Sequence, residues 1–202
     1  HRDLHSFPTR RSSDLVSVDT YKSALARRAL QAGASIVNDI SGLTFDSAMM
    51  EVVRAGTAGV VIMHMKGTPR DMQRDPHYVD VIAEVSEFLQ RQKERAVQAG
   101  IHERAIVIDP GIGFGKRLQD NFTLLRELRQ FAGIGSPILV GPSRKSFIGA
   151  MLDLPVDQRL EGTAAAVSAA ILNGANIIRV HDVLAMRRVA TIVDRILAAP
   201  AR

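Results

Sequence analysis

From Val16 onward, six short apolar runs alternate with longer segments of helical periodicity, and this alternation limits the fold more than any other feature. Each run is nearly continuous in apolar residues and then ends in polar ones. That pattern is typical of parallel strands whose two faces are both covered. The six predicted strands are Val16–Asp19, Ser35–Asp39, Gly59–His64, Ala105–Asp109, Ile138–Gly141 and Ile177–His181.

The segments between these runs predict helices, because apolar residues recur there at spacings of three and four. A glycine follows four of the segments, at the position where a left-handed residue commonly ends a helix. These four predicted helices are Tyr21–Ala32, Asp46–Ala55, Tyr78–Ala99 and Glu161–Asn173. A further predicted helix carries an apolar stripe from Val183 to Ile196.

Six strand–helix units fit either a doubly wound open sheet or a (β/α)8 TIM barrel that lacks two of its units. An open sheet gathers its ligand-binding residues at one switch point, whereas a barrel brings the ends of all its strands to one site. Here every predicted strand ends in or near polar residues: Asp19, Asn38 with Asp39, His64, Asp109, Ser143 to Lys145, and Arg179 with His181. We therefore predict an α/β fold of the barrel type that retains six parallel strands.

The composition excludes several kinds of protein. The chain has no cysteine, which excludes a disulfide scaffold, a Cys-ligated zinc site and a thiol nucleophile. No apolar run reaches the roughly 18 to 20 residues of a membrane-spanning helix. Aromatic residues make up 4% of the chain, which leaves little material for stacking on nucleic-acid bases. We expect a soluble cytoplasmic domain without nucleic-acid or membrane partners.

The first fifteen residues, His1–Leu15, are polar, basic and without periodicity, unlike the rest of the chain. They fit a flexible tail, or an import signal that lacks the expected amphipathic stretch. A third interpretation fits better, because His5–Leu15 resembles the codon-by-codon translation of a common sequencing-adapter oligonucleotide. We therefore predict a non-native tail over residues 1–15 and a partial barrel domain over residues 16–202.

Arg179 lies in the last predicted strand, where a period of two places it on the same face as His181. An unpaired cation inside a barrel would be costly. Two interpretations stay open at this point. One is an internal salt bridge to an aspartate, and the other is a guanidinium fork for an anionic ligand such as phosphate.

Two turns that follow predicted strands carry residues suited to ligands. Gly141–Ser146 opens a helical segment with two cations, so it is either an anion site or a solvated basic turn. Asp109–Lys116 fails the dinucleotide pattern because Lys116 replaces the third glycine, and fails the Walker pattern because Arg117 follows. It is either a flexible turn or a site where Asp109 accepts paired N–H donors of a heterocycle lying close to the glycines.

Other candidate residues have ordinary structural explanations. Asp19 before Thr20 suits a helix N-cap, and Asn38 suits a loop cap. His64, between two methionines, suits a packed histidine better than a metal ligand. No group of residues at metal-binding spacing supports a catalytic metal site.

Taken together, these motifs resemble dihydropteroate synthase, a family of pterin-binding TIM barrels in folate biosynthesis. The matching segments are SVDT at Ser17–Thr20, NDISG at Asn38–Gly42, MHMKGTPRDMQ at Met63–Gln73, DPGIGFGK at Asp109–Lys116, SRKSFIG at Ser143–Gly149 and RVHD at Arg179–Asp182. The resemblance implies a transferase that joins 6-hydroxymethyl-7,8-dihydropterin pyrophosphate to 4-aminobenzoate, giving 7,8-dihydropteroate and pyrophosphate. It also implies that the first two βα units of the barrel are missing.

The resemblance further implies roles for individual residues. Those that would hold the pterin are Asp19, Asn38, Met63, Asp109, Phe114, Gly141 and Lys145. Ser143 and Arg144 would lie near the aminobenzoate, and Arg179 and His181 would bind the pyrophosphate. Lys145, Arg179 and His181 would be the catalytic residues.

The resemblance implies Mg²⁺ as a cofactor, bound by an asparagine in a loop of the missing units, so no metal ligand is expected in this chain. It also implies a homodimer when the barrel is complete, formed through the last two large helices. Pro142 departs from the family pattern, in which Met or another non-proline residue precedes SRKS.

Two alternatives stay open. A methyltetrahydrofolate-binding methyltransferase barrel would share the Asp and Asn that hold the pterin, but has no need of Arg179 with His181 or of the SRK turn. A non-catalytic pterin-binding paralogue would keep the same pocket. Because the loops that would bind Mg²⁺ and aminobenzoate are missing, we expect the chain as printed to be inactive alone.

Overall fold

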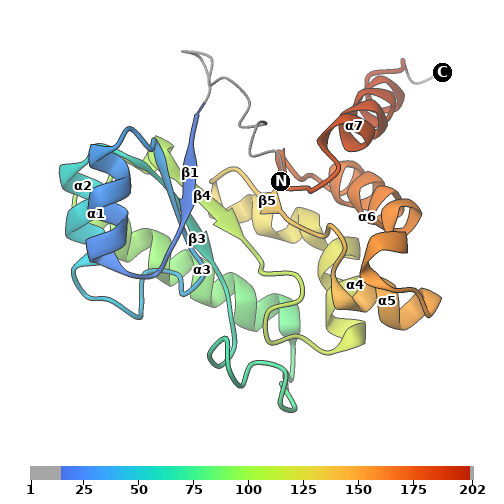
Figure 1. Cartoon of the computed structure of the whole chain (residues 1–202), viewed down its shortest axis with the longest axis horizontal. Helices are drawn as coiled ribbons and strands as arrows, with labels where there is room; N and C mark the ends of the chain where they lie inside the picture. Colours follow the sequence, from blue (N-terminus) through green and yellow to red (C-terminus); the bar gives the residue numbers. More distant parts are fainter. Residues whose placement is uncertain (1–14, 201–202) are drawn as a thin grey trace, which may run out of the picture.

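The computed structural model describes residues 15–200, so the predicted non-native tail lies outside the described residues except for Leu15. Six strands, all parallel, form its centre (Figure 1). Strands β1 to β4 pair in chain order, β5 pairs with β6, and an isolated bridge between Ile108 and Ile138 joins the two groups. The strands are β1 Ser17–Asp19, β2 Ile36–Asp39, β3 Gly59–Met63, β4 Ile106–Asp109, β5 Leu139–Val140 and β6 Ile177–Ile178. The predicted set of six parallel strands is confirmed.

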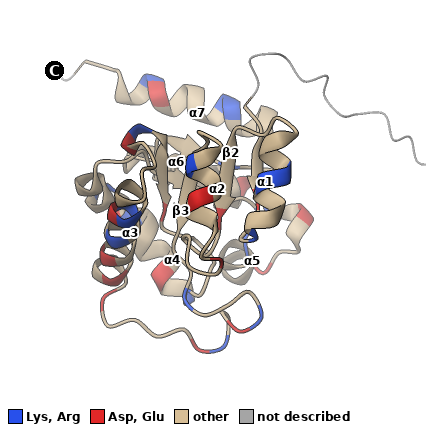
Figure 2. Cartoon of the chain, turned by 90° about the vertical axis from the view of Figure 1, so that its left-hand side faces the viewer, with Lys and Arg blue, Asp and Glu red and all other residues tan. Residues whose placement is uncertain are grey.

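Helices alternate with the strands along the described chain. The α-helices are α1 Ser23–Gln31, α2 Met49–Ala55, α3 Val81–Gln98, α4 Leu118–Arg126, α5 Ser146–Leu152, α6 Leu160–Leu172 and α7 Val183–Leu197. Three short 3-10 helices are η1 Glu103–Ala105, η2 Leu128–Ile134 and η3 Val156–Gln158. Helices α1 and α2 lie side by side, and most charged residues sit on helices and loops rather than on the strands (Figure 2).

The predicted helix starts at positions 21, 46 and 78 are too early by two or three residues. Asp46 lies ahead of α2, where its carboxylate accepts hydrogen bonds from the backbone N–H groups of Ser23 and Ala48. Asp80 caps α3, accepting from the N–H groups of Ile82 and Ala83. An acidic residue is better placed as a cap than inside the first turn, because it satisfies N–H groups that have no partner within the helix.

Helix α4 was not among the predicted helices, and α5 was predicted only as the helical segment that Gly141–Ser146 opens; the two have nine and seven residues. Helix α4 begins with Arg117 and Asp120 close together, where the Asp120 carboxylate accepts from the Arg117 backbone N–H at 2.8 Å and from its guanidinium. Local capping of this kind leaves no long apolar period in the sequence, so periodicity alone misses such helices.

The prediction that the last strand extends to His181 is wrong. Strand β6 ends at Ile178, although Arg179 still donates its backbone N–H to Val140 at 3.0 Å. The N–H of His181 instead donates to the Ser143 hydroxyl at 3.2 Å. A side-chain acceptor thus replaces the next backbone hydrogen bond between β5 and β6, and the chain leaves the sheet.

The apolar core lies between the strands and helices α1 to α6, and it includes fully buried residues such as Leu89 and Phe131. A second, smaller cluster joins α6 to α7 through Val167, Ile171 and Met186. Several large apolar side chains of α7, Leu184 among them, are exposed. Within residues 15–200, no helix combines the length and the apolar character that crossing a membrane requires.

We expect Leu89→Ala to lower the free energy of unfolding by roughly 2 to 5 kcal/mol, because it opens a cavity in the core between α3 and the strands. Leu184→Ala is the matched control, since this leucine is 67% exposed and its truncation should cost under about 0.5 kcal/mol. Urea unfolding of both variants measures the difference. Equal losses would contradict the placement of the core.

Candidate functional site

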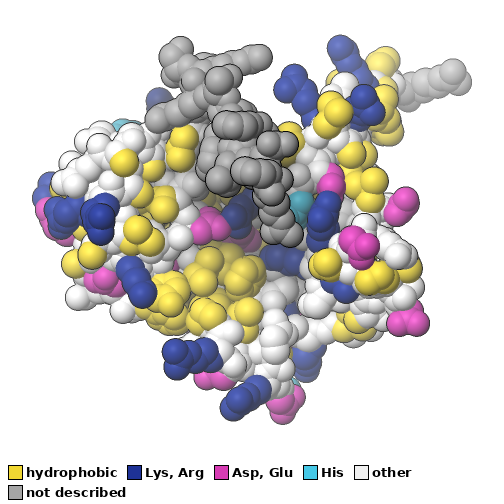
Figure 3. Space-filling view, viewed as in Figure 1, with side chains coloured by type: hydrophobic (Ala, Val, Ile, Leu, Met, Phe, Trp, Pro, Cys, Tyr) yellow, Lys and Arg dark blue, Asp and Glu magenta, His cyan; other side chains and the backbone are white. Residues whose placement is uncertain are grey.

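The carboxyl ends of the parallel strands meet around one cavity of about 190 Å³. Parallel pairing puts equivalent ends of neighbouring strands at the same edge, so the polar residues that follow the strands converge there. In Figure 3 acidic, basic and histidine side chains gather around the middle of this face, beside an apolar patch. The cavity is lined by Asn38, Ile40, Met63, Asp109, Phe114, Gly141, Ser143, Lys145, Arg179, Val180 and His181.

The predicted site residues line this cavity, with two exceptions, Asp19 and Arg144. Asp19 lies beside it and accepts hydrogen bonds from Asn38 and Arg179. Its predicted alternative as an N-cap is wrong, because α1 is preceded by Lys22 and has no side-chain cap. Ile40 and Val180 were not predicted, since an isolated apolar residue in a loop carries no signal that separates it from the core.

Asn38 presents an unsatisfied acceptor. Its Nδ2 donates to Asp19 Oδ1 at 2.8 Å, whereas its Oδ1 is buried and has no hydrogen-bond partner. A buried polar atom without a partner costs free energy comparable to a lost hydrogen bond. A ligand that donates a hydrogen bond to Asn38 Oδ1 would therefore be stabilised in this cavity.

Asp109 is a buried carboxyl at the end of β4. Its Oδ1 accepts from the backbone N–H of Gly111 at 2.7 Å. Burial raises its pKa, while the neighbouring Lys145 and the Gly111 hydrogen bond act in the opposite direction. Such a carboxyl gains most from a ligand that donates hydrogen bonds, because water is largely excluded from it.

Lys145 enters the cavity from the turn between β5 and α5. Its ammonium donates to the carbonyl of Ile112 and lies 4.5 Å from the ring centre of Phe114. Burial lowers its pKa to about 8, and Asp109 counteracts part of that shift. Lys145 is thus a half-buried donor that lies against the Phe114 ring and is influenced by the Asp109 carboxylate.

Arg179 and Asp19 form an ion pair at 2.5 Å on the open side of the cavity. Their side chains are 58% and 47% exposed, so the predicted alternative of an internal salt bridge is wrong in its location. An exposed pair contributes little to stability and can exchange partners at low cost. The guanidinium therefore stays accessible to an anion at the mouth of the cavity.

Ser143 and His181 form a pair on the same side, with 2.9 Å between the hydroxyl and His181 Nδ1. Arg144, the next residue, has a positive φ of 58° and turns its guanidinium away to Asp182, at 2.6 Å. Its backbone N–H is held by the hydroxyl of Thr163 at 3.0 Å. The turn thus presents Ser143 and Lys145 to the cavity, but not the Arg144 side chain.

The glycine loop after Asp109 lies close against the segment that follows β3. Gly111 has a φ of +73°, and a Cβ there would overlap the carbonyl oxygen of His64. His64 itself is 7% exposed and packs edge-on against Phe88 at 5.0 Å, so the prediction of a packed histidine is confirmed. Its ring nitrogen Nδ1 lies 2.9 Å from Lys116 Nζ.

The residues present do not fit a magnesium site. Across residues 15–200 there is no group of three or more His, Asp or Glu side chains placed to hold a metal ion. The carboxylates near the cavity already accept hydrogen bonds, Asp109 from Gly111 and Asp19 from Asn38 and Arg179. No chemical step is therefore derived through a metal.

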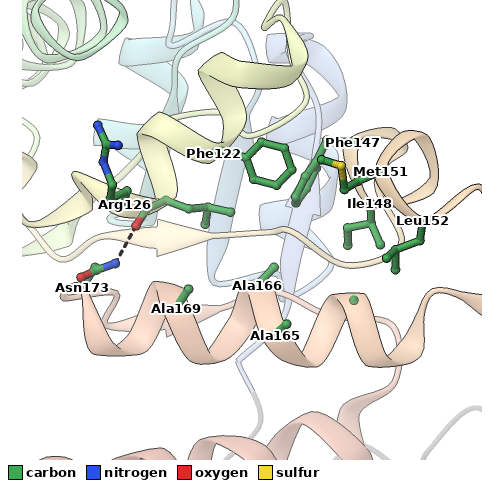
Figure 4. A pocket seen from close by; sticks show the side chains of 12 residues that line it. Phe122, Arg126, Phe147, Ile148, Met151, Leu152, Ala165, Ala166, Ala169 and Asn173 are labelled. Carbon is green, nitrogen blue, oxygen red and sulfur yellow. Dashed lines mark hydrogen bonds between the residues drawn. The ribbon is translucent and has the colours of Figure 1, made fainter.

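A second, larger hollow of about 410 Å³ lies between α4, α5 and α6, away from the strand ends. Figure 4 shows the rings of Phe122 and Phe147 next to each other, with Met151 beside them, across the hollow from the alanine-rich side of α6. Its polar members lie at one end, where Asn173 Nδ2 donates to the carbonyl of Leu125 at 2.9 Å. Without converging charged or polar groups, it is not a site for chemistry.

Comparisons with known proteins point to one family. A family model described as "Pterin binding enzyme" matches residues 6–181. This range begins inside the predicted non-native tail, whose origin stays a prediction. The dihydropteroate synthase of Synechocystis sp. is 46% identical over 180 residues, which cover 89% of this chain and 62% of that relative.

Two solved structures are similar over nearly the whole chain. The dihydropteroate synthase of Yersinia pestis, in a sulfonamide drug complex, has a TM-score of 0.90 and 40% identity, and the match covers 94% of this chain and 68% of that one. The enzyme of Thermus thermophilus in complex with 6HMPPP has a TM-score of 0.85 and 40% identity, covering 91% and 72%. These matches confirm the predicted fold class.

We expect the fold to lose stability as the pH falls from about 6.5 to about 3, because of His64. Burial, with Lys116 nearby, lowers the pKa of His64 from 6.5 to about 3. In that window the unfolded chain binds a proton that the folded chain does not, so acid favours unfolding by roughly 1.4 kcal/mol per pH unit. Above pH 6.5 this contribution is fully present.

His64→Gln removes the titrating ring and keeps an acceptor for Lys116. Its free energy of unfolding, measured by urea titration at several pH values, should fall less steeply between pH 6.5 and 3 than that of the unchanged chain. Parallel pH profiles would show that His64 is protonated normally in the folded state.

Proposed function

Because the chain belongs to the pterin-binding enzyme family, as its motifs predicted, we propose that it supplies the substrate-holding part of a dihydropteroate synthase. In the proposed transfer, the bond between the pterin methylene carbon and the pyrophosphate oxygen breaks, and pyrophosphate leaves with the electron pair. The amine nitrogen of 4-aminobenzoate forms the new bond to that carbon and loses a proton. The observation that carries the proposal is the convergence of Asn38, Asp109, Lys145 and Arg179 on one cavity.

The pterin ring is proposed to lie in the inner part of the cavity. A pterin presents adjacent N–H donors along one edge, and these suit the free Asn38 Oδ1 and the buried Asp109 carboxyl. Met63 and Phe114 supply apolar surface for the ring, and Gly141 adds no side chain to the wall. Lys145 would bind an acceptor atom of the pterin instead, because its ammonium only donates hydrogen bonds.

The leaving pyrophosphate is proposed to lie at the mouth, against Arg179 and His181. Bond breaking builds negative charge on the pyrophosphate, and donors fixed where charge develops lower the barrier. The exposed Asp19–Arg179 pair supports this assignment, since Arg179 can exchange one weakly held carboxylate for a more highly charged anion.

The aminobenzoate is proposed to approach beside Ser143, which lines the cavity next to His181. The arylamine is a weak nucleophile, so positioning it against the methylene carbon contributes more than a strong base would. Arg144 could contact the carboxylate of aminobenzoate only after leaving Asp182. Magnesium is not assigned to any residue of this chain.

The alternatives differ in what they need at the mouth of the cavity. A methyltetrahydrofolate-binding methyltransferase has no pyrophosphate to bind, and the presence of Arg179 and His181 beside the cavity favours a synthase. A non-catalytic pterin-binding paralogue would bind the pterin without forming pteroate. Because the proposed substrates are small, charged and soluble, the proposed location is the cytoplasm.

The chain spans 62% of the Synechocystis relative, so the test of activity needs a longer protein as well. We expect a hybrid that joins the part of that relative preceding the match to Val16 to form 7,8-dihydropteroate, and the 202-residue chain alone to bind 6-hydroxymethylpterin without turnover. Binding by both proteins without turnover would support the non-catalytic alternative. Absence of pterin binding in both would refute the proposed function.

We expect Arg179→Ala to weaken binding of 6-hydroxymethylpterin pyrophosphate by about 10- to 100-fold, the usual loss for charge-assisted hydrogen bonds. Binding of 6-hydroxymethylpterin, which lacks the pyrophosphate, should change little. The free energy of unfolding should fall by under about 1 kcal/mol, because the Asp19–Arg179 pair is exposed. Calorimetric titration with both ligands separates the two effects.

Arg126→Ala is the matched control, since this arginine lies on α4 and is 75% exposed in its pair with Glu127. It should leave both affinities unchanged. If Arg179→Ala instead weakens both ligands equally or unfolds the chain, its role is structural.

We also expect the complete barrel to form a homodimer through α6 and α7. On α6, Ala165 is exposed and Ala169 is partly exposed, so another helix can approach closely there, and the apolar hollow beside them offers further area to bury (Figure 4). Sedimentation equilibrium of the hybrid at micromolar concentration should give a dimer, and Ala165→Arg should give a monomer. A monomer for the unchanged hybrid would refute this expectation.

A further inference from the structure

Lys116 is a buried cation that does not line the cavity. It is 4% exposed, and its ammonium bonds to the carbonyls of Phe114 at 2.9 Å, Gly111 at 3.2 Å and His64 at 3.4 Å. Its fourth partner is His64 Nδ1 at 2.9 Å. None of these partners is a carboxylate. Burying an ammonium against neutral acceptors is costly, and burial lowers the pKa of Lys116 to about 7.

Two of these bonds, to the carbonyl and the ring of His64, join segments that are far apart in the sequence, and the other two lie within the loop that contains Lys116. His64 follows β3, whereas Gly111 and Phe114 belong to the loop after β4. The two segments touch so closely that a Cβ at Gly111 would overlap the His64 carbonyl, and one at Gly115 would overlap the backbone of Lys66. Lys116 therefore fixes the loop after β4 at the point where this loop contacts the segment that follows β3.

The other side of the same loop supports the cavity. The N–H of Gly111 holds Asp109 Oδ1 at 2.7 Å, and the carbonyl of Ile112 accepts from Lys145. The ring of Phe114 lies 4.5 Å from the Lys145 ammonium. Three cavity residues, Asp109, Phe114 and Lys145, thus take their positions from the loop that Lys116 holds.

We infer that Lys116, with His64 as its acceptor, is a positioning residue that holds the glycine loop in the shape required for pterin binding. It acts through Asp109, Phe114 and Lys145 and does not itself line the cavity. The identity of the ligand rests on the proposed function, whereas the positioning of the loop does not.

The contact also fixes the protonation of the His64 ring. When Lys116 is protonated it only donates, so in that state Nδ1 accepts and the remaining proton of the neutral ring sits on Nε2. Burial keeps this ring neutral, with a pKa of about 3. The ¹⁵N chemical shifts of His64 therefore report directly on the Lys116 contact.

The experiment compares Lys116→Met with Lys93→Met in the 202-residue chain. Lys93 is the matched control, because it is also buried, 6% exposed, and donates to a backbone carbonyl, that of Ile134. It pairs with Glu103 ahead of β4, at the opposite end of the strands from the cavity. Both variants lose a buried ammonium, but only Lys116→Met loses the contact between the glycine loop and His64.

With 6-hydroxymethylpterin as the probe, Lys116→Met should weaken binding at least tenfold, and Lys93→Met should change it less than twofold. Hydrogen exchange at the amides of residues 111–115 should quicken at least tenfold in Lys116→Met only, and the His64 Nδ1 resonance should shift in that variant only. Equal affinity and equal exchange in the two variants would overturn the inference.

If Lys116→Met does not fold, His64→Leu, which removes the side-chain acceptor, carries the same test, with a smaller loss of affinity and faster exchange in the same loop. If neither the unchanged chain nor the hybrid binds the pterin, the proposed function fails. The exchange and ¹⁵N measurements then decide the inference alone. Loop exchange that is unchanged in Lys116→Met refutes it, and faster exchange with a shifted His64 resonance supports it.

Discussion

The register of the parallel strands is the constraint on which the rest of the structure depends. Asp19 is paired with Asn38 across β1 and β2, and Met63 with Asp109 across β3 and β4. A slip of one residue would turn each of these side chains to the other face of the sheet. The hydrogen-bond ladder therefore positions the cavity, and the helices secure the ladder by covering its apolar faces.

Charge is distributed in two ways around the cavity. The inner groups are Asp109, which is buried, and Lys145, which is half-buried; desolvation raises the pKa of Asp109 and lowers that of Lys145, which favours the neutral form of each. The outer pair, Asp19 and Arg179, is exposed and weakly held. A pterin pyrophosphate has the matching division, with a neutral hydrogen-bonding ring and a highly charged tail, so one ligand can satisfy both regions.

Much of this site was predictable because its residues lie at strand ends, and strands are visible as apolar runs. Asn38, Asp109 and Arg179 were found in this way, whereas Met63 was predicted only from the motif resemblance. The sequence-based predictions failed where the position of a side chain depends on a contact with a residue far along the chain. Lys116 meets His64 across 52 residues of sequence, a contact that no local pattern indicates.

The same reason explains the remaining differences. Arg144 turns away from the cavity because Asp182 and Thr163 hold it, and both lie far along the chain. Strand β6 is short because the Ser143 hydroxyl takes the N–H of His181. Motif resemblance placed these residues near the site, but only the tertiary contacts determine which side chain enters it.

A crystal structure of the chain with 6-hydroxymethylpterin tests the central claim most directly. The account predicts the ring in the strand-end cavity, with its N–H edge donating to Asn38 Oδ1 and to Asp109, and its faces against Met63 and Phe114. A ring bound elsewhere, or an empty cavity at saturating ligand, would contradict the assignment of this cavity as the pterin site.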